Sequence, residues 1–167
     1  MACEYTTLCY IEKDGKLLML HRTKKKNDPN KGLWMGVGGH LEGDESPDEC
    51  VLREVFEETG LTLTDYRLRS VINFSDGDWK EIMFLYHAYG FTGELKECSE
   101  GELAWIEKDK AVYGLPSWEG DKIFLHNMFT RKEFFALELI YENRVLKKAL
   151  LDCEEIDPDE YIRRSFV

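Results

Sequence analysis

Three glutamates in the stretch REVFEETG, Glu54, Glu57 and Glu58, have the spacing of neighbours on one face of a helix. Like charges so placed destabilise an exposed helix by about 0.2–0.5 kcal/mol per pair. Clustered carboxylate oxygens suit a hard dication such as Mg²⁺ or Mn²⁺, which can then hold the phosphates of a substrate. The cluster therefore indicates metal-assisted phosphate chemistry. The commoner explanation of such a charge cluster is a helix face exposed to solvent.

The segments around the cluster are those that would position it. Ser46 and Pro47, followed by two acidic residues, predict the start of a helix, and Gly60 predicts its end after Thr59. The preceding stretch GLWMGVGGHLEGDE is rich in glycine, so its backbone can approach a ligand closely. The apolar side chains of this helix are expected to face the core and to leave the glutamates on another side; they are Val51, Leu52, Val55 and Phe56.

The rest of the chain alternates between strand and helix patterns. The sequence predicts a hairpin over residues 5–22 around Asp14-Gly15, strands near 65–74, 80–90 and 102–107, a helix from Ser117 to Phe129, and a closing hairpin turning at Glu142-Asn143. Interleaved strands and helices predict a mixed β-sheet with helices packed against it, in the α/β (α+β) class.

Composition and charge exclude several classes of partner. The 167 residues suit one domain, and the net charge of -11 argues against a nucleic acid duplex or an anionic membrane as partner. The N-terminus lacks a signal-peptide pattern, and no apolar run is long enough to span a membrane. The five cysteines show no metal-ligand spacing and indicate reduced thiols in a cytoplasmic protein; they are Cys3, Cys9, Cys50, Cys98 and Cys153.

The stretch from Gly39 to Leu61, GHLEGDESPDECVLREVFEETGL, resembles the 23-residue Nudix box at each of its defining positions. The hairpin before it and the strand order after it are also similar to those of Nudix hydrolases. The resemblance implies a Nudix fold, in which a mixed β-sheet lies between helices and a loop–helix–loop carries the box. We expect a Nudix hydrolase domain over residues 1–150, with the polar C-terminal tail, 151–167, packed on or trailing the same domain.

Nudix hydrolases cleave a pyrophosphate bond in nucleoside diphosphate derivatives with a divalent metal ion. The resemblance implies a metal site, and the predicted ligands are the Gly39 carbonyl and the carboxylates of Glu54, Glu57, Glu58 and Glu100. The general base stays open between Glu54, Glu57 and Glu100. Arg53 is expected to pair with a glutamate of its own helix, and Glu45 to brace the loop.

Outside the box, ECSEGELAWIEKDK and LPSWEGDKIFL resemble segments of MutT-like and oxidised-purine nucleoside triphosphate hydrolases. This resemblance implies that Glu100 reaches the metal and that Trp118 and Asp121 contact the base. Met35 stands where the oxidised-purine enzymes have asparagine, and methionine cannot read a base edge with strong hydrogen bonds. Gly38 is expected to approach the substrate.

Two of these features have plain structural alternatives. Trp118, like Trp105, can be a core residue, since a tryptophan is more often buried than used as a platform for a ligand. The basic loop TKKKNDPNKG, at 23–32, is either solvated or a cationic lid over a triphosphate, in which Arg22 is the residue expected to touch phosphate.

The sequence thus predicts a Mg²⁺- or Mn²⁺-dependent Nudix pyrophosphohydrolase that converts a nucleoside triphosphate to the monophosphate and pyrophosphate, with 8-oxo-dGTP or a related purine as candidate substrate. The alternatives are a hydrolase of ordinary nucleoside triphosphates or of a nucleotide sugar, and a Nudix module that senses nucleotides without turnover. The expected partner is a small nucleotide, and the chain is expected to be a monomer or a homodimer.

Overall fold

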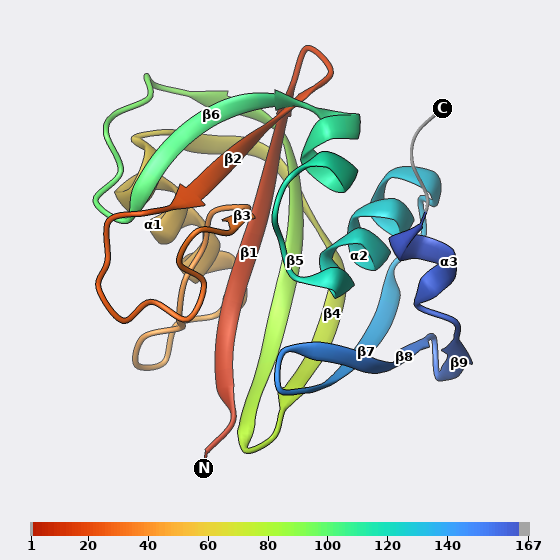
Figure 1. Cartoon of the computed structure of the whole chain (residues 1–167). Helices are drawn as coiled ribbons and strands as arrows, with labels where there is room; N and C mark the ends of the chain where they lie inside the picture. Colours follow the sequence, from red (N-terminus) through yellow and green to blue (C-terminus); the bar gives the residue numbers. More distant parts are fainter. Residues whose placement is uncertain (1, 164–167) are drawn as a thin grey trace.

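The computed structural model describes residues 2–163, which form one mixed sheet with helices on both sides (Figure 1). Its strands are β1 (Glu4–Lys13), β2 (Lys16–Arg22), β3 (Trp34–Met35), β4 (Thr62–Asp76), β5 (Trp79–Thr92), β6 (Gly101–Glu107), β7 (Phe135–Glu142), β8 (Val145–Leu151) and β9 (Glu154–Ile156). The helices are α1 (Pro47–Thr59), α2 (Glu119–Thr130), the short α3 (Asp159–Ile162) and one π-helical turn, η1 (Lys110–Gly114).

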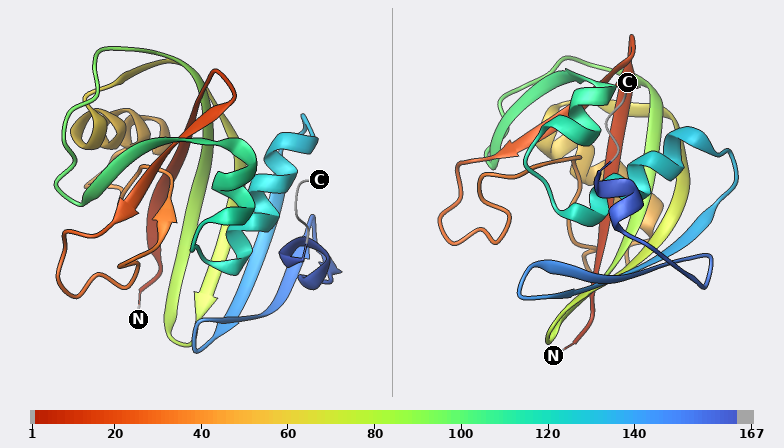
Figure 2. Two further views of the ribbon diagram at one scale, coloured as in Figure 1. Left: turned by 45° about the horizontal axis from the view of Figure 1, so that its top comes forward. Right: turned by 45° about the vertical axis from the view of Figure 1, so that its right-hand side comes forward.

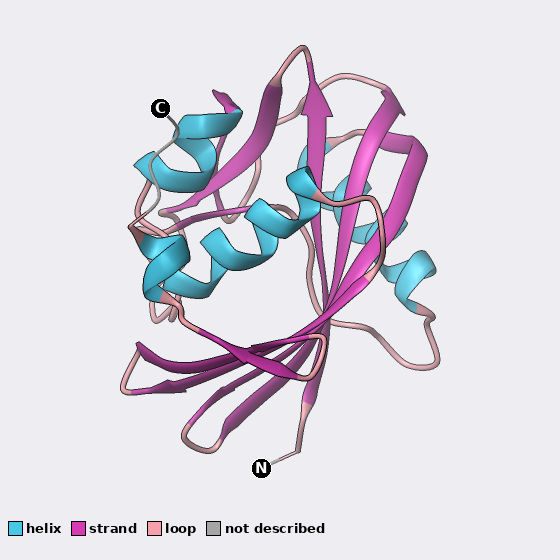
Figure 3. Ribbon diagram, turned by 90° about the vertical axis from the view of Figure 1, so that its right-hand side faces the viewer, coloured by secondary structure: helices cyan, strands magenta, loops and turns pink. Residues whose placement is uncertain are grey.

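The strand order is β3-β2-β1-β5-β4-β7-β8-β9, with β6 paired to the other side of β2. β1 runs parallel to β5, and β4 runs parallel to β7, whereas the remaining pairs are antiparallel. The strands twist strongly across the sheet (Figure 3). The predicted mixed α+β architecture is confirmed.

The β1–β2 hairpin separates soon after its turn. The two strands pair only at Glu12–Leu17 and Lys13–Lys16, after which β1 continues along β5 and β2 continues along β6. The glycine-rich segment fills the gap: β3 pairs with β2, and Val37 then exchanges backbone hydrogen bonds with Cys9 of β1. This separation leaves room for a cavity beside β1.

Each face of the sheet has its own apolar core, because successive residues of a strand point to opposite faces. On β1, Leu8 and Tyr10 join the cluster under α2, whereas Cys9 and Ile11 join the cluster under α1. Figure 2 shows α1 and α2 on either side of β1 and β5. The sheet therefore lies between the two helices, as the resemblance implied.

The start of α1 is formed by local interactions that the sequence indicated. Ser46 caps the helix by accepting a hydrogen bond from the Glu49 N–H, and the Glu49 carboxylate accepts one from the Ser46 N–H. Gly60 ends the helix in the left-handed conformation, with φ of 80°. The expected apolar stripe is wrong at one position, because Phe56 is 54% exposed and Cys50 is buried instead.

Other differences lie at element ends. The closing hairpin turns at Asn143-Arg144, one residue later than predicted, because Glu142 still pairs with Val145. The second helix begins at Glu119, with Trp118 as its N-cap residue. Strands β4 and β5 are longer than predicted and leave only Gly77 and Asp78 between them. The pattern did not reveal η1, β9 or α3; β9 pairs with β8, and α3 contacts α2.

Candidate active site

Arg53 connects two carboxylates of α1 with one from the loop before the helix. Its Nε and Nη2 atoms donate to Glu45 at 2.6 and 3.0 Å, and its Nη1 donates to Glu54 at 2.8 Å and Glu57 at 3.2 Å. Nη2 also donates to the His40 carbonyl, which ties the helix to the preceding loop. Hydrogen bonds from Arg53 lower the pKa of Glu45 to about 2. As predicted, Arg53 pairs with glutamates of its own helix, and Glu45 braces the loop.

Glu58 and Glu100 are adjacent although 42 positions separate them in the chain. Glu58 is 7% exposed and accepts a hydrogen bond from the Gly38 N–H at 3.0 Å. Burial and the neighbouring Glu100 carboxyl raise the pKa of Glu58 well above its ordinary value. Glu100 in turn pairs with Arg22 at 2.7 Å and with Lys25. Burial opposes ionisation of Glu100, but these cations and the hydrogen bond with Glu58 leave its pKa below the ordinary value.

The glycines of the loop are required where the backbone passes other groups closely. A Cβ atom on Gly38 would collide with the Thr7 carbonyl, and one on Gly39 would lie 2.5 Å from the Glu54 carboxylate. The Gly39 carbonyl, a predicted metal ligand, accepts a hydrogen bond from the Thr7 N–H at 2.8 Å. The loop thus lies directly against the Glu54 carboxylate.

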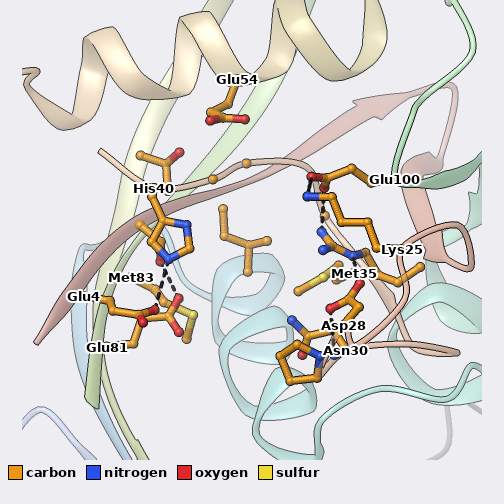
Figure 4. A pocket seen from close by; sticks show the side chains of 18 of the residues that line it. Glu4, Lys25, Asp28, Asn30, Met35, His40, Glu54, Glu81, Met83 and Glu100 are labelled. Carbon is orange, nitrogen blue, oxygen red and sulfur yellow. Dashed lines mark hydrogen bonds and ion pairs between the residues drawn. The ribbon is translucent and has the colours of Figure 1, made fainter. Parts of the chain in front are cut away.

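A cavity of about 620 Å³ opens beside β1, and several of these residues line it (Figure 4). Glu54 and Gly39 line one part of it, and Arg22, Lys25 and Glu100 line another. The Arg22 guanidinium is bound by two acids, since its Nε also donates to Asp28 at 2.7 Å. The cavity can therefore hold a polyanion only together with cations that balance the surrounding carboxylates.

A smaller pocket of about 50 Å³ adjoins this cavity. Both are lined by Met35 and Trp79, whereas Trp118 and Asp121 line only the small pocket. The Trp118 Nε1–H donates to the Asn30 side chain at 2.7 Å. The pocket is mostly aromatic and aliphatic, which suits the flat face of a base.

Asp121 is a polar residue of the small pocket whose carboxyl has no hydrogen-bond partner in the described part of the chain. It is 8% exposed, and no hydrogen bond reaches its carboxyl from any residue between 2 and 163. Burial raises the pKa of Asp121 to about 8. A buried polar group without a partner costs free energy, and a ligand that supplies the hydrogen bond removes that cost.

This pKa has a testable consequence for stability. Because the folded pKa of Asp121 lies above its ordinary value of 3.8, the folded chain binds the proton more tightly. Its contribution to the free energy of unfolding should fall as pH rises from about 4 to about 8. Asp121→Asn does not ionise, so its stability relative to the wild type should increase by more than about 1 kcal/mol over that range. Urea unfolding of both chains at pH 5 and pH 8 measures this, and a difference independent of pH would contradict it.

The predicted site residues do not all converge. Arg22, Met35, Gly38, Gly39, Glu54 and Glu100 line the large cavity, and Trp118 and Asp121 the pocket beside it. Glu57 and Glu58 line neither: the Glu57 side chain is 57% exposed, and Glu58 lies behind Gly38. Within residues 2–163, no three acidic, histidine or cysteine side chains are arranged to hold a metal ion as they stand.

The donor set nevertheless suits a hard dication, because it offers carboxylate and carbonyl oxygens without sulfur or imidazole nitrogen. Glu58 beside Glu100 is unfavourable when both are ionised, and a dication next to them would relieve the repulsion. In this structure Arg53 pairs with Glu54 and Glu57, and Arg22 and Lys25 pair with Glu100. The carboxylate and carbonyl oxygens that these glutamates and the loop offer fit Mg²⁺ or Mn²⁺.

The sequence did not predict several residues that line the cavity. Glu4 lines the cavity and accepts from His40 at 3.0 Å, while Glu81 accepts from Thr6 at 2.6 Å. Alternation along the strands was the available signal, because Trp79, Glu81 and Met83 occupy every second position of β5. The sequence did not reveal which face of that strand would border a cavity.

The fold and site define a class of protein: an α+β domain in which a helix with clustered glutamates and a glycine-rich loop border a cavity of about 620 Å³. The NUDIX domain family model matches residues 5–128. The chain belongs to the Nudix family and is a Nudix hydrolase.

Individual relatives support the assignment to the Nudix family. The chain is 34% identical over 149 residues to the uncharacterized Nudix hydrolase YvcI of Bacillus subtilis, covering 78% of this chain and 89% of that protein. It is 26% identical over 148 residues to the oxidized purine nucleoside triphosphate hydrolase of Danio rerio, covering 87% and 92%. The crystal structure of the MutT protein from Bacillus halodurans matches with a TM-score of 0.80 at 28% identity, covering 90% of this chain and 99% of that one. In the part of the chain that the structure describes, no helix is long and apolar enough to cross a membrane.

Proposed function

We propose that this Nudix hydrolase is a Mg²⁺-dependent pyrophosphohydrolase that converts a purine nucleoside triphosphate to the monophosphate and pyrophosphate. One observation carries the proposal: the cavity bordered by Glu54 and Glu100 adjoins a small aromatic pocket, and the buried Asp121 carboxyl of that pocket has no hydrogen-bond partner among residues 2–163. A triphosphate beside the glutamates would leave its base within reach of that pocket.

Different residues of the chain would bind the phosphates and the base of the substrate. A bound dication would neutralise phosphate oxygens and acidify a water molecule for attack on phosphorus, and Glu54, Glu57, Glu58, Glu100 and the Gly39 carbonyl would hold it. Arg53 keeps Glu54 and Glu57 oriented. The general base is Glu54, Glu57 or Glu100, and of these Glu54 and Glu100 already border the cavity. Arg22 and Lys25 would turn from Glu100 to the phosphates.

The base would lie in the small pocket, with Trp118 and Met35 against its faces and Asp121 at its edge. Below its pKa of about 8, the Asp121 carboxyl both donates and accepts a hydrogen bond. The similarity to the Danio rerio oxidized purine nucleoside triphosphate hydrolase supports an oxidised purine as substrate. Because Met35 offers no strong hydrogen bond, ordinary purine nucleoside triphosphates are the second candidate.

A substrate panel tests this assignment. We expect Mg²⁺-dependent release of pyrophosphate from dGTP, 8-oxo-dGTP or dATP. Asp121→Asn should change the ranking of these substrates more than the best rate, and most clearly above pH 8, where the wild-type carboxylate only accepts while asparagine still donates. Met35→Asn should raise the preference for 8-oxo-dGTP over dGTP. Unchanged ratios in both variants would place base recognition elsewhere, and a chain that binds these nucleotides without turnover would be a sensing module.

We also propose a cytoplasmic location, supported by the five cysteines, all of which are free thiols, with Cys9, Cys50 and Cys98 buried. The proposed active form is a monomer or a homodimer.

A further inference from the structure

The turn between β7 and β8 has an unusual residue at its second position. Asn143 and Arg144 have φ values of 51° and 66°, in the left-handed region that favours glycine. The β1–β2 turn has the same conformation with the preferred pair, since Asp14 and Gly15 have φ values of 51° and 76°. Arginine at position 144 therefore destabilises the turn relative to glycine. Non-glycine residues in this conformation cluster at functional sites.

The side chain of Arg144 contacts Trp118, which lines the small pocket, although Arg144 does not line the pocket itself. Its guanidinium lies over the Trp118 ring, 4.3 Å from the ring centroid, in a cation–π contact. Its backbone N–H donates to the Asp76 carboxylate at 2.9 Å, which joins this turn to the end of β4. The backbone of Arg144 is thus anchored to β4 while its guanidinium lies against Trp118.

Trp118 is fixed from its other sides as well. The rings of Phe74, Trp79 and Tyr141 meet it edge to face, with centroids 5.4, 6.0 and 5.1 Å away. Its ring N–H donates to Asn30. Among the residues that contact Trp118, Arg144 is exposed to solvent. It lies in the β7–β8 turn, outside the Nudix box.

We propose that Arg144 is a positioning residue for base recognition: its guanidinium holds the Trp118 ring in the orientation that receives the base. The inference rests on the proposed function, because it requires a base in the small pocket. It also makes the β7–β8 turn part of the substrate site, so that the length and sequence of this turn influence which base is accepted.

Arg144→Gly separates this role from a structural one, because glycine improves the turn while removing the guanidinium and keeping the N–H bonded to Asp76. We expect an unchanged or higher melting temperature, a KM for the preferred purine nucleoside triphosphate raised about two- to five-fold, and little change in kcat. Arg144→Lys should restore part of the lost affinity, since it keeps the cation without the planar guanidinium.

Cys153→Gly is the matched control. Cys153 has a φ of 70° in the β8–β9 turn, so glycine relieves the same backbone conformation, but Cys153 carries no cation that could contact the Trp118 ring as Arg144 does. Its KM should equal that of the wild type. A KM of Arg144→Gly equal to that of Cys153→Gly would overturn the inference.

Fluorescence separates failure of the inference from failure of the proposed function. Acrylamide quenching, taken as the difference between each chain and its Trp118→Phe counterpart, should increase in Arg144→Gly without any substrate. Unchanged quenching would overturn the positioning role. Absence of nucleoside triphosphate hydrolysis by the wild type would instead overturn the proposed function.

Discussion

Glu57→Gln should reduce turnover by about a hundredfold or more while the chain stays folded. The amide keeps the shape of the side chain but loses the charge with which Glu57 would hold a dication or accept a proton. The fold should survive, because the Glu57 side chain is 57% exposed and its contact with Arg53 is a surface pair, worth about 0.3–0.5 kcal/mol on a helix. Steady-state kinetics at saturating Mg²⁺ and a thermal melt measure the two effects.

The same variant tests metal binding apart from turnover. Mg²⁺ or Mn²⁺ at millimolar concentration should raise the melting temperature of the wild type, because the proposed site would bind a dication in the folded chain and not in the unfolded one. The increase should be smaller in Glu57→Gln. Glu133→Gln serves as control, since Glu133 is exposed, lies outside the site and makes no ion pair with another described residue. Near-normal turnover of Glu57→Gln would remove Glu57 from the metal ligands.

Arg53→Ala should lower the free energy of unfolding by about 1.5–3 kcal/mol and abolish most of the activity. The Arg53 side chain is only 22% exposed and bonds to Glu45, Glu54, Glu57 and the His40 carbonyl. Its loss would leave three carboxylates close together without a counter-charge. Arg53→Lys should recover only part of the stability, because an ammonium cannot donate along the several directions of the guanidinium.

Urea unfolding monitored by circular dichroism measures this change. Arg163→Ala provides the comparison, because Arg163 pairs with Asp159 on an exposed surface and should contribute no more than about 0.5 kcal/mol. Equal losses of unfolding free energy in the two variants would show that the Arg53 hydrogen bonds stabilise the fold no more than an exposed ion pair does.

Local signals predicted α1 and its surroundings well. The capping residues Ser46 and Pro47 and the terminal Gly60 act within a few positions of themselves, so their effects could be predicted from the sequence. The turn at Asn143-Arg144 was placed one residue early because arginine is rare in the left-handed conformation, and its contact with Trp118 could not be anticipated.

Burial was harder to predict than secondary structure. A helical stripe placed Phe56 inside, but the sheet covers the helix face that carries Cys50, Val51, Val55 and Glu58. Glu58 was expected to lie with the other glutamates. Its burial against Glu100 depends on how the loop before β6 returns to the cavity, which no local pattern encodes.

The early separation of β1 from β2 has a consequence for folding. Two adjacent strands would form a hairpin rapidly if they paired along their whole length, but here they share two residue pairs before each joins a distant partner. The cavity depends on contacts such as Thr6 with Glu81 and Arg22 with Glu100, which close loops of 75 and 78 residues. Such long-range closure slows folding, because the entropy of the loop is lost before its contacts form. The site should therefore be among the last parts of the molecule to assemble, and a nascent chain that ends before residue 100 cannot yet contain it.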